Sequence, residues 1–199
     1  MSKEEVPPLN RKKSMTAYDL AFIGVMAAII YVVTMFRIPV GQSKIHLANA
    51  VCLLAGMLFG PISGGLAAGI GSALYDALAG GYDIANVAIT FVSKFAMAAV
   101  CGLMTGSLRE KKEEKTGRSS WLNDTGKIIL ACVVGALTYV ALYMLKSWLF
   151  KVYVEPVPPE TLPAVLIGKL IPSLINAAAA VIVAPLLYVP LKKVMNTVK

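Results

Sequence analysis

Charged side chains are scarce in this chain of 199 residues: Asp, Glu, Lys and Arg make up 15% of it, while hydrophobic residues make up 57%. The mean hydropathy is +0.71. A soluble domain carries about 25% charged residues, so this composition excludes a water-soluble protein. Uncharged stretches cover residues 20–36, 45–75, 95–108, 128–145 and 170–191. Because about 20 apolar helical residues cross a hydrocarbon core, these stretches predict membrane spans.

The sequence also has few residues that could bind a metal, form a disulfide or bind ATP. The chain has one histidine, His46, and three cysteines without CxxC or Cys/His spacing, which argues against a metal site or a disulfide framework. The pattern GxxxxGK[ST] is absent, so any ATP-driven step needs another chain. An intramembrane serine protease would need Ser63 or Ser72 beside His46, but Ser63 is predicted at the opposite membrane face and no third group orients the histidine. We therefore expect neither an enzyme nor a cofactor in this chain.

Six helices account for the apolar stretches. The first covers about residues 16–36, and 44–81 must hold two helices because Gly60 and Pro61 break it near its middle. The remaining three cover about residues 84–108, 127–150 and 164–191. The sequence thus predicts an all-α integral membrane six-helix bundle. Its parts are a tail at 1–16, one transmembrane domain at 17–191 with a solvated loop at 109–127, and an end at 192–199.

The net charge of +8 comes from basic residues that flank the apolar stretches, which indicates membrane orientation rather than nucleic-acid binding. Thirteen of the nineteen Lys and Arg residues lie in the tail, the 109–127 loop and the C-terminal end. The positive-inside rule therefore predicts that both termini are cytoplasmic. The outward loops would be about 37–45, 79–84 and 151–163, in a multi-pass protein of a bacterial-type plasma membrane.

Polar residues at membrane depth are costly and need a reason. Lys94 is predicted about 15 Å deep at 1.5 Å per residue. Two interpretations fit it equally: a buried ion pair with Asp76 that fixes the packing, or a direct contact with a ligand. Lys169 lies nearer a helix end, where its side chain can snorkel outward. Asn176 is deeper, and an interhelical hydrogen bond is the favoured role for it.

Polar and aromatic residues converge on the predicted outward loops. Each aromatic residue taken alone is typical of the belt of aromatic side chains at the membrane–water interface. Together they favour a half-apolar cavity for a small, ring-containing solute, because every outward loop contributes them and the inward turn at Gly60 offers almost none. The group comprises Arg37, Gln42, Lys44, His46, Asn49, Tyr75, Tyr82, Asp83, Asn86, Thr90, Tyr143, Trp148 and Tyr153.

A strip of small residues marks the first helix. Ala17, Ala21, Gly24 and Ala28 fall on one sector at helical spacing. Small residues allow helices to approach closely in lipid. Packing inside the subunit is the favoured interpretation from the residues alone, and docking of another membrane protein is the alternative.

Several motifs between Lys44 and Met104 carry a family resemblance. They are Ile45-His46-Leu47, Leu58-Phe59-Gly60-Pro61, Gly69-Ile70-Gly71-Ser72-Ala73-Leu74 followed by Asp76, and Lys94. With them the chain resembles the substrate-binding S component of energy-coupling factor (ECF) transporters, in the branch of riboflavin-type and hydroxymethylpyrimidine- or pyridoxine-type carriers. The resemblance implies a six-helix bundle that binds a vitamin from outside and associates with a transmembrane coupling subunit and two cytoplasmic ATPases. It also implies that the strip at Ala17, Ala21, Gly24 and Ala28 contacts the coupling subunit.

We therefore expect the high-affinity substrate-binding subunit of an ATP-driven importer in the lipid bilayer. The solute would be a pyridoxine- or hydroxymethylpyrimidine-like heterocycle, or alternatively riboflavin or another vitamin-like compound. A stand-alone secondary transporter or channel, and a purely structural membrane subunit, remain as rivals. The residues expected to line the binding site are His46, Asn49, Tyr75, Asp76, Tyr82, Asn86, Thr90, Lys94 and Lys169.

Overall fold

Long helices dominate the chain. The computed structural model describes residues 15–40, 43–114 and 121–197. Side chains are described for these residues except at 40, 107–114, 121–124 and 195–197. The helices are α1 (Ala17–Met35), α2 (Ala48–Leu78), α3 (Ile84–Glu114), α4 (Trp121–Leu149) and α5 (Leu162–Thr197). All five are long and apolar enough to cross a membrane. The prediction of a helical membrane protein is therefore confirmed.

Helix α2 consists of two helical segments that fold back on each other. Gly60 has φ 79° and ψ −173° and is followed by Pro61, so the helix breaks at the left-handed conformation that glycine tolerates. Twenty residues of continuous helix would separate Cys52 and Ser72 by about 30 Å. Their Sγ and Oγ atoms lie 3.9 Å apart. Residues 48–59 and 61–78 therefore lie side by side. The chain reverses at Gly60 and Pro61, where the sequence predicted a break.

The helix boundaries follow from local sequence, with one error in the prediction. Helix α1 begins after Thr16, whose side chain forms a capping box with Asp19. The 109–127 segment was expected to be a loop, yet α3 continues to Glu114 and α4 already begins at Trp121. Lys, Arg and Glu have good helix propensity, so a charged segment can extend a helix beyond the apolar stretch. Residues 115–120 lie outside the described residues.

The loop expected at 37–45 contains a β-hairpin instead. Strands β1 (Arg37–Val40) and β2 (Ser43–His46) pair antiparallel, with Arg37 opposite His46 and Val40 opposite Ser43. Four-residue strands are too short to show a periodic signal, which explains why the sequence did not reveal them. After α4, the π-helix η1 (Phe150–Val154) continues the chain toward α5.

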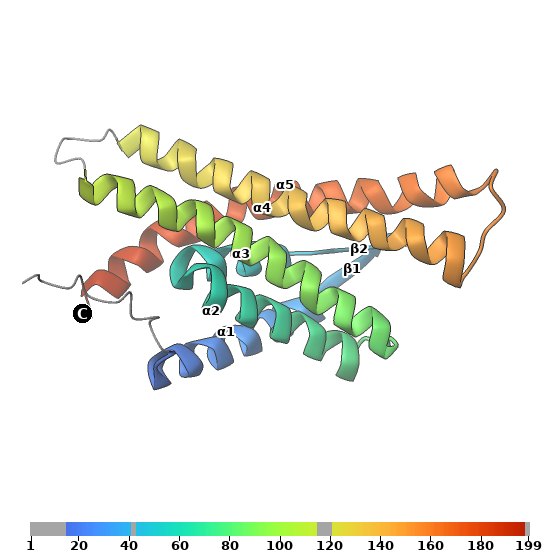
Figure 1. Ribbon diagram of the computed structural model, residues 1–199, viewed down its shortest axis with the longest axis horizontal. Helices are drawn as coiled ribbons and strands as arrows, with labels where there is room; N and C mark the ends of the chain where they lie inside the picture. Colours follow the sequence, from blue (N-terminus) through green and yellow to red (C-terminus); the bar gives the residue numbers. More distant parts are fainter. Residues whose placement is uncertain (1–14, 41–42, 115–120, 198–199) are drawn as a thin grey trace, which may run out of the picture.

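The two ends of the molecule carry different elements. Helix α1 begins, and α5 ends, at the same end (Figure 1). The β-hairpin, η1 and the α2–α3 connection lie toward the other end. Between them, close packing excludes solvent from Cys52, Cys101 and Cys132, which are fully buried free thiols.

The small residues of α1 do not pack inside the subunit. Ala17, Ala21, Gly24 and Ala28 are all exposed, and a Cβ atom at Gly24 would have no neighbour within 4 Å. The buried face of α1 is formed instead by Ile23, Met26, Ala27, Ile30 and Thr34. The favoured interpretation of intramolecular packing for this strip is therefore wrong.

Candidate functional site

A cavity of about 420 Å³ lies at the end that carries the β-hairpin and η1. Its walls come from the end of α1, the hairpin, α2, the α2–α3 connection, the first part of α3, the last part of α4, η1 and the first part of α5. The lining extends from Tyr82, which is 41% exposed, to Lys94, which is 4% exposed. The volume is within the range of about 300–1,000 Å³ typical of small-molecule sites.

Seven of the nine residues expected at the site line this cavity. They are His46, Asp76, Tyr82, Asn86, Thr90, Lys94 and Lys169. The other two lie behind the wall and contact lining residues. Asn49 is a hydrogen-bond partner of Lys94, and the ring of Tyr75 lies 4.6 Å from the guanidinium carbon of Arg37.

Lys94 forms the deep end of the cavity. It belongs to α3, and its ammonium donates a hydrogen bond to Oδ1 of Asn49 on α2. Its Nζ also lies 4.0 Å from the centroid of the Tyr139 ring on α4, a favourable cation–π geometry. Of the two interpretations given to this lysine, the ion pair with Asp76 is not formed. An amide oxygen and an aromatic face contact the buried amine instead.

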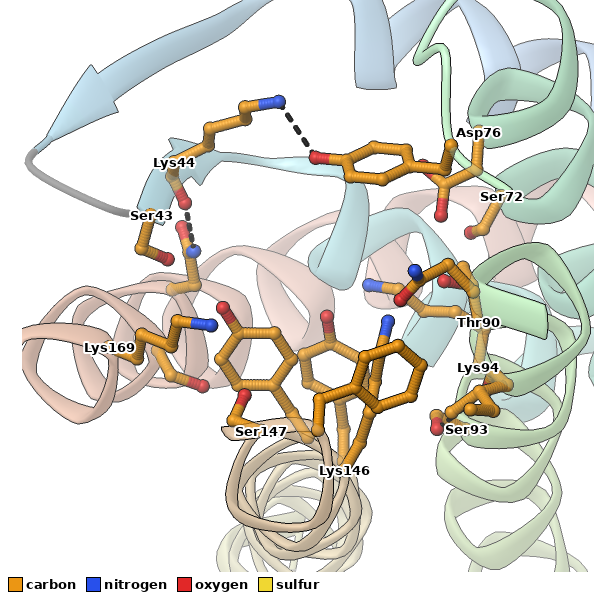
Figure 2. Close-up of a pocket in the computed structure, with 18 of the residues that line it drawn as sticks. Ser43, Lys44, Ser72, Asp76, Thr90, Ser93, Lys94, Lys146, Ser147 and Lys169 are labelled. Atoms are coloured by element: carbon orange, nitrogen blue, oxygen red, sulfur yellow. Dashed lines mark hydrogen bonds between the residues drawn. The ribbon is translucent and has the colours of Figure 1, made fainter. Parts of the chain in front are cut away.

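The β-hairpin is fastened over the cavity by hydrogen bonds from other elements. Asn176 of α5 accepts from the backbone N–H of His46 at 2.9 Å and donates to the carbonyl of Lys44 at 2.7 Å. Lys44 Nζ donates to the Tyr82 hydroxyl at 2.9 Å, which Figure 2 shows as a dashed line. Asn176 was expected to join two helices, but it joins a helix to a strand that the sequence did not reveal.

Two buried polar atoms in the wall have no hydrogen-bond partner: Nδ1 of His46 and Oγ of Ser173. Burial, together with the positive charges of Lys94, Arg37 and Lys44, lowers the pKa of His46 from 6.5 to about 3. The imidazole is therefore neutral at pH 7. Both atoms are available to a polar solute, since buried polar groups normally have a partner.

The face that α4 and α5 turn toward the cavity was predicted only in part: Lys169 was expected at the site and Tyr143 near it, whereas Tyr139, Ser147 and Ser173 were missed. On α4 the lining residues are Tyr139, Tyr143, Lys146 and Ser147, and Phe150 follows at the start of η1. On α5 they are Lys169, Ser173 and Asn176. Steps of three and four residues separate most of them, which places each set on one helix face. This spacing was visible in the sequence, but only the neighbouring helices determine that the face meets a cavity rather than a packed core.

The cavity and the apolar helices around it define a class: a multi-pass membrane protein with a small-molecule-sized, polar and aromatic cavity at one end of a helical bundle. Most of this bundle is closely packed, and the cavity lies among the ends of its helices.

Comparison with known proteins identifies the family. Residues 14–193 match the ECF-type riboflavin transporter S component family, and the chain belongs to it. This match confirms the resemblance drawn from the motifs between Lys44 and Met104. The family consists of transport subunits of the membrane rather than enzymes.

A solved structure shares the fold. It is described as the S component of a bacterial ECF transporter, and it matches with a TM-score of 0.58 and 18% identity over 92% of this chain and 98% of that chain. At this identity the likeness establishes the fold alone. None of the curated proteins compared matches the chain.

Proposed function

We propose that this chain is the high-affinity substrate-binding subunit of an ATP-driven ECF importer for a water-soluble vitamin or vitamin precursor. The main support is the cavity of about 420 Å³, because seven residues expected at a solute site from sequence line it. The chain would bind and release the solute without covalent chemistry.

The solute would be a heterocycle of the pyridoxine or hydroxymethylpyrimidine kind. Tyr82, Tyr139, Tyr143 and Phe150 offer ring faces in the lining, and aromatic faces stack on planar heterocycles. Neutral His46 and the amide of Asn86 offer hydrogen bonds to ring heteroatoms or hydroxyls. Riboflavin is the second candidate, favoured by the description of the family.

Ligand identification tests this function. The protein, purified in detergent, is analysed by mass spectrometry for a co-purifying small molecule, and the affinity for that molecule is then measured. We expect Lys94→Ala and Asn86→Ala each to weaken binding about tenfold or more, because each removes a hydrogen-bonding group from the cavity. The matched control is Lys127→Ala, an exposed position at the other end of α4. Unchanged affinity in both cavity variants would show that the pocket is wrong.

The orientation is part of the proposal. The two segments of α2 would each cross the membrane, giving six spans with both termini in the cytoplasm and the cavity facing outward. Because the three native cysteines are fully buried, the unmodified protein supplies a low background for thiol labelling. A membrane-impermeant maleimide should label Glu155→Cys in intact cells, and Lys127→Cys only after lysis. The reverse pattern would contradict the orientation.

The exposed strip on α1 is the proposed docking site for the transmembrane coupling subunit, which would bring two cytoplasmic ATPases. Gly24→Leu should abolish co-purification with that complex, because a bulky side chain prevents close helix approach. Val25→Leu is the control, because Val25 is the adjacent residue and is also exposed. Both substitutions introduce a leucine side chain. An intact complex with Gly24→Leu would argue against docking at this strip.

A stand-alone transporter is distinguished by reconstitution. Liposomes that contain only this chain should take up no solute, whereas addition of the coupling subunit, the ATPases and ATP should start uptake. Uptake by the chain alone would favour the secondary transporter.

A further inference from the structure

Positive charge outnumbers negative charge in the cavity lining. Six cationic side chains line it, Arg37, Lys44, Lys94, Lys146, Lys151 and Lys169, against the three carboxylates of Asp76, Asp83 and Glu155. A neutral solute would leave this excess of charge uncompensated at the edge of a low-dielectric bundle, where it is costly.

Two of the carboxylates are already engaged. Glu155 forms an ion pair with Lys151 at 2.7 Å. Asp83 accepts hydrogen bonds from the backbone N–H and the side-chain amide of Asn86, at 2.7 and 2.8 Å. Asp76 is the third carboxylate, and it forms no ion pair with any residue that the structure describes. It comes from α2, on another side of the cavity from α4 and α5 (Figure 2).

Most of the cations have partners as well. Lys44 donates to Tyr82, Arg37 lies over the Tyr75 ring, and Lys94 donates to Asn49. Two lysines differ. Lys146 makes no hydrogen bond or ion pair with the residues that the structure describes, and its Nζ lies 5.6 Å from the centroid of the Phe150 ring. Lys169 makes no hydrogen bond, ion pair or ring contact within the described part of the chain.

These two lysines face the same space. Lys146 extends from α4 and Lys169 from α5, and both side chains reach into the cavity in Figure 2. A buried serine of the lining is near each lysine in the sequence: Ser147 directly follows Lys146, and Ser173 lies four residues after Lys169. Both serines are 3% exposed. The Ser173 hydroxyl has no partner and can donate to an oxygen between the two amines.

We propose that the solute carries a carboxylate or a phosphate, and that Lys146 and Lys169 bind this anionic group with the help of the Ser173 hydroxyl. This inference rests on the proposed function, since it assigns a charge to the solute of the same cavity. Lysine suits the role because its ammonium acts as a compact point charge toward phosphate and carboxylate oxygens. Snorkelling, which was expected for Lys169, does not account for two amines from different helices that reach into one cavity.

Matched pairs of compounds test the charge of the solute. The probes are pyridoxine with pyridoxine 5′-phosphate, riboflavin with riboflavin 5′-phosphate, and nicotinamide with nicotinate, titrated against the full chain in detergent by calorimetry. In at least one pair the anionic member should bind about tenfold tighter or more, as expected for a charge-assisted contact. Its affinity should also fall with added salt, because partly exposed charges are screened.

Charge-removing variants assign the effect to the two lysines. Lys146→Gln and Lys169→Gln should each weaken binding of the anionic member about tenfold and leave the neutral member of the same pair almost unchanged. Binding of the neutral member also reports that each variant is folded. Lys127→Gln and Lys192→Gln are the controls, since they make the same charge change on α4 and α5 outside the cavity lining.

The outcomes separate this inference from the proposed function. If at least one compound binds but no anionic member binds more tightly than its neutral partner, the anion site is overturned while the vitamin-binding function stands. An anionic preference that persists in both glutamine variants also overturns the assignment to Lys146 and Lys169. If no member of any pair binds, the result counts against both the proposed function and the anion site.

Discussion

The two ends of the bundle differ in what fills the space between the helices. Toward the end where α1 begins, helices touch through glycine: the position of a Cβ at Gly56 would overlap the carbonyl of Ala98, and one at Gly102 would lie 2.7 Å from the carbonyl oxygen of Gly56. At the other end, long side chains such as Lys94, Tyr139 and Lys146 line an open cavity. Close backbone contact leaves no room for a ligand, so the same helices serve as scaffold at one end and as binding site at the other.

The two ends also differ in energetic terms. The packed end gains dispersion and close helix contact, and none of the described residues in its core has a buried side-chain N or O atom without a partner. Among the described residues, the cavity end holds a buried lysine amine that forms no ion pair, and two buried polar atoms without a hydrogen-bond partner. Such features cost stability and are retained where they bind something. Substitutions at the packed end should therefore affect folding, and substitutions at the cavity end should affect binding.

The largest effect is expected at the packed end. Gly56→Ala should destabilise the protein by about 3 kcal/mol, the upper part of the range for overpacking, because the added methyl meets backbone that cannot move aside. Gly126→Ala should instead stabilise the protein by roughly 0.5–1 kcal/mol, since that helical glycine has nothing within 4 Å. Thermal unfolding in detergent measures both. A shift of the same sign in the two variants would show that close backbone contact at Gly56 does not determine the effect of the added methyl.

The next effect separates binding from stability at Lys94. Lys94→Met should weaken solute binding by about 2–3 kcal/mol and leave Asn49 Oδ1 without its donor. The double variant Lys94→Met/Asn49→Leu removes both polar partners, so its thermal stability should equal or exceed that of the single variant while binding stays lost. A double variant that is less stable than Lys94→Met alone would indicate that this pair holds the fold together.

The difference between the ends also explains what the sequence could predict. The break at Gly60-Pro61, the start of α1 at Thr16 and the depth of Lys94 all follow from local rules of composition and spacing. The hairpin at 37–46 depends on Asn176, which is 130 residues from His46, so no local pattern contained it. The small residues of α1 had the right spacing for packing, yet only the neighbours decide which face of a helix is buried.

The same limit applies to the site. Tyr82 and Asn86 were predicted because they lie in, or within one helical turn of, a connection between spans. Tyr139 and Ser173 were missed because they lie within apolar stretches, where an aromatic ring or a hydroxyl is equally typical of a packed core. Tyr139 shares a face of α4 with Lys146, and Ser173 shares a face of α5 with Lys169. These shared faces indicate a function only once the cavity is known.

A smaller effect is expected where the hairpin is fastened. Asn176→Ala removes the hydrogen bonds to the His46 N–H and the Lys44 carbonyl, together worth about 2 kcal/mol. Because these bonds hold one short element, the loss should appear as faster hydrogen exchange at the amides of β1 and β2, with little change in global unfolding. Thr138→Ala, which loses a hydrogen bond within α4, should leave that exchange unchanged. Slow exchange in Asn176→Ala would show that other contacts hold the hairpin.

The smallest effect concerns pH and again arises at the cavity end. The pKa of His46 is lowered to about 3 in the folded protein, against 6.5 for an ordinary histidine. Above pH 6.5 the imidazole is neutral in both states and contributes nothing; as the pH falls from 6.5 toward 3, only the unfolded chain takes up the proton, so stability is lost. At pH 5.5, one unit below the pKa of the unfolded chain, the loss is about 1.4 kcal/mol.

The variant His46→Gln isolates this contribution. Between pH 7.5 and 5.5 its unfolding temperature should fall less than that of the unmodified protein, because glutamine takes up no proton. The hydrogen bonds that lower the pKa of Asp83 and of Glu155 are present in both proteins, so the difference between the two curves cancels their titration. Parallel curves would mean that His46 reaches solvent and that the wall around it is open. The packed end has no histidine, so a pH dependence in this range that disappears with His46→Gln places the titrating group in the cavity wall.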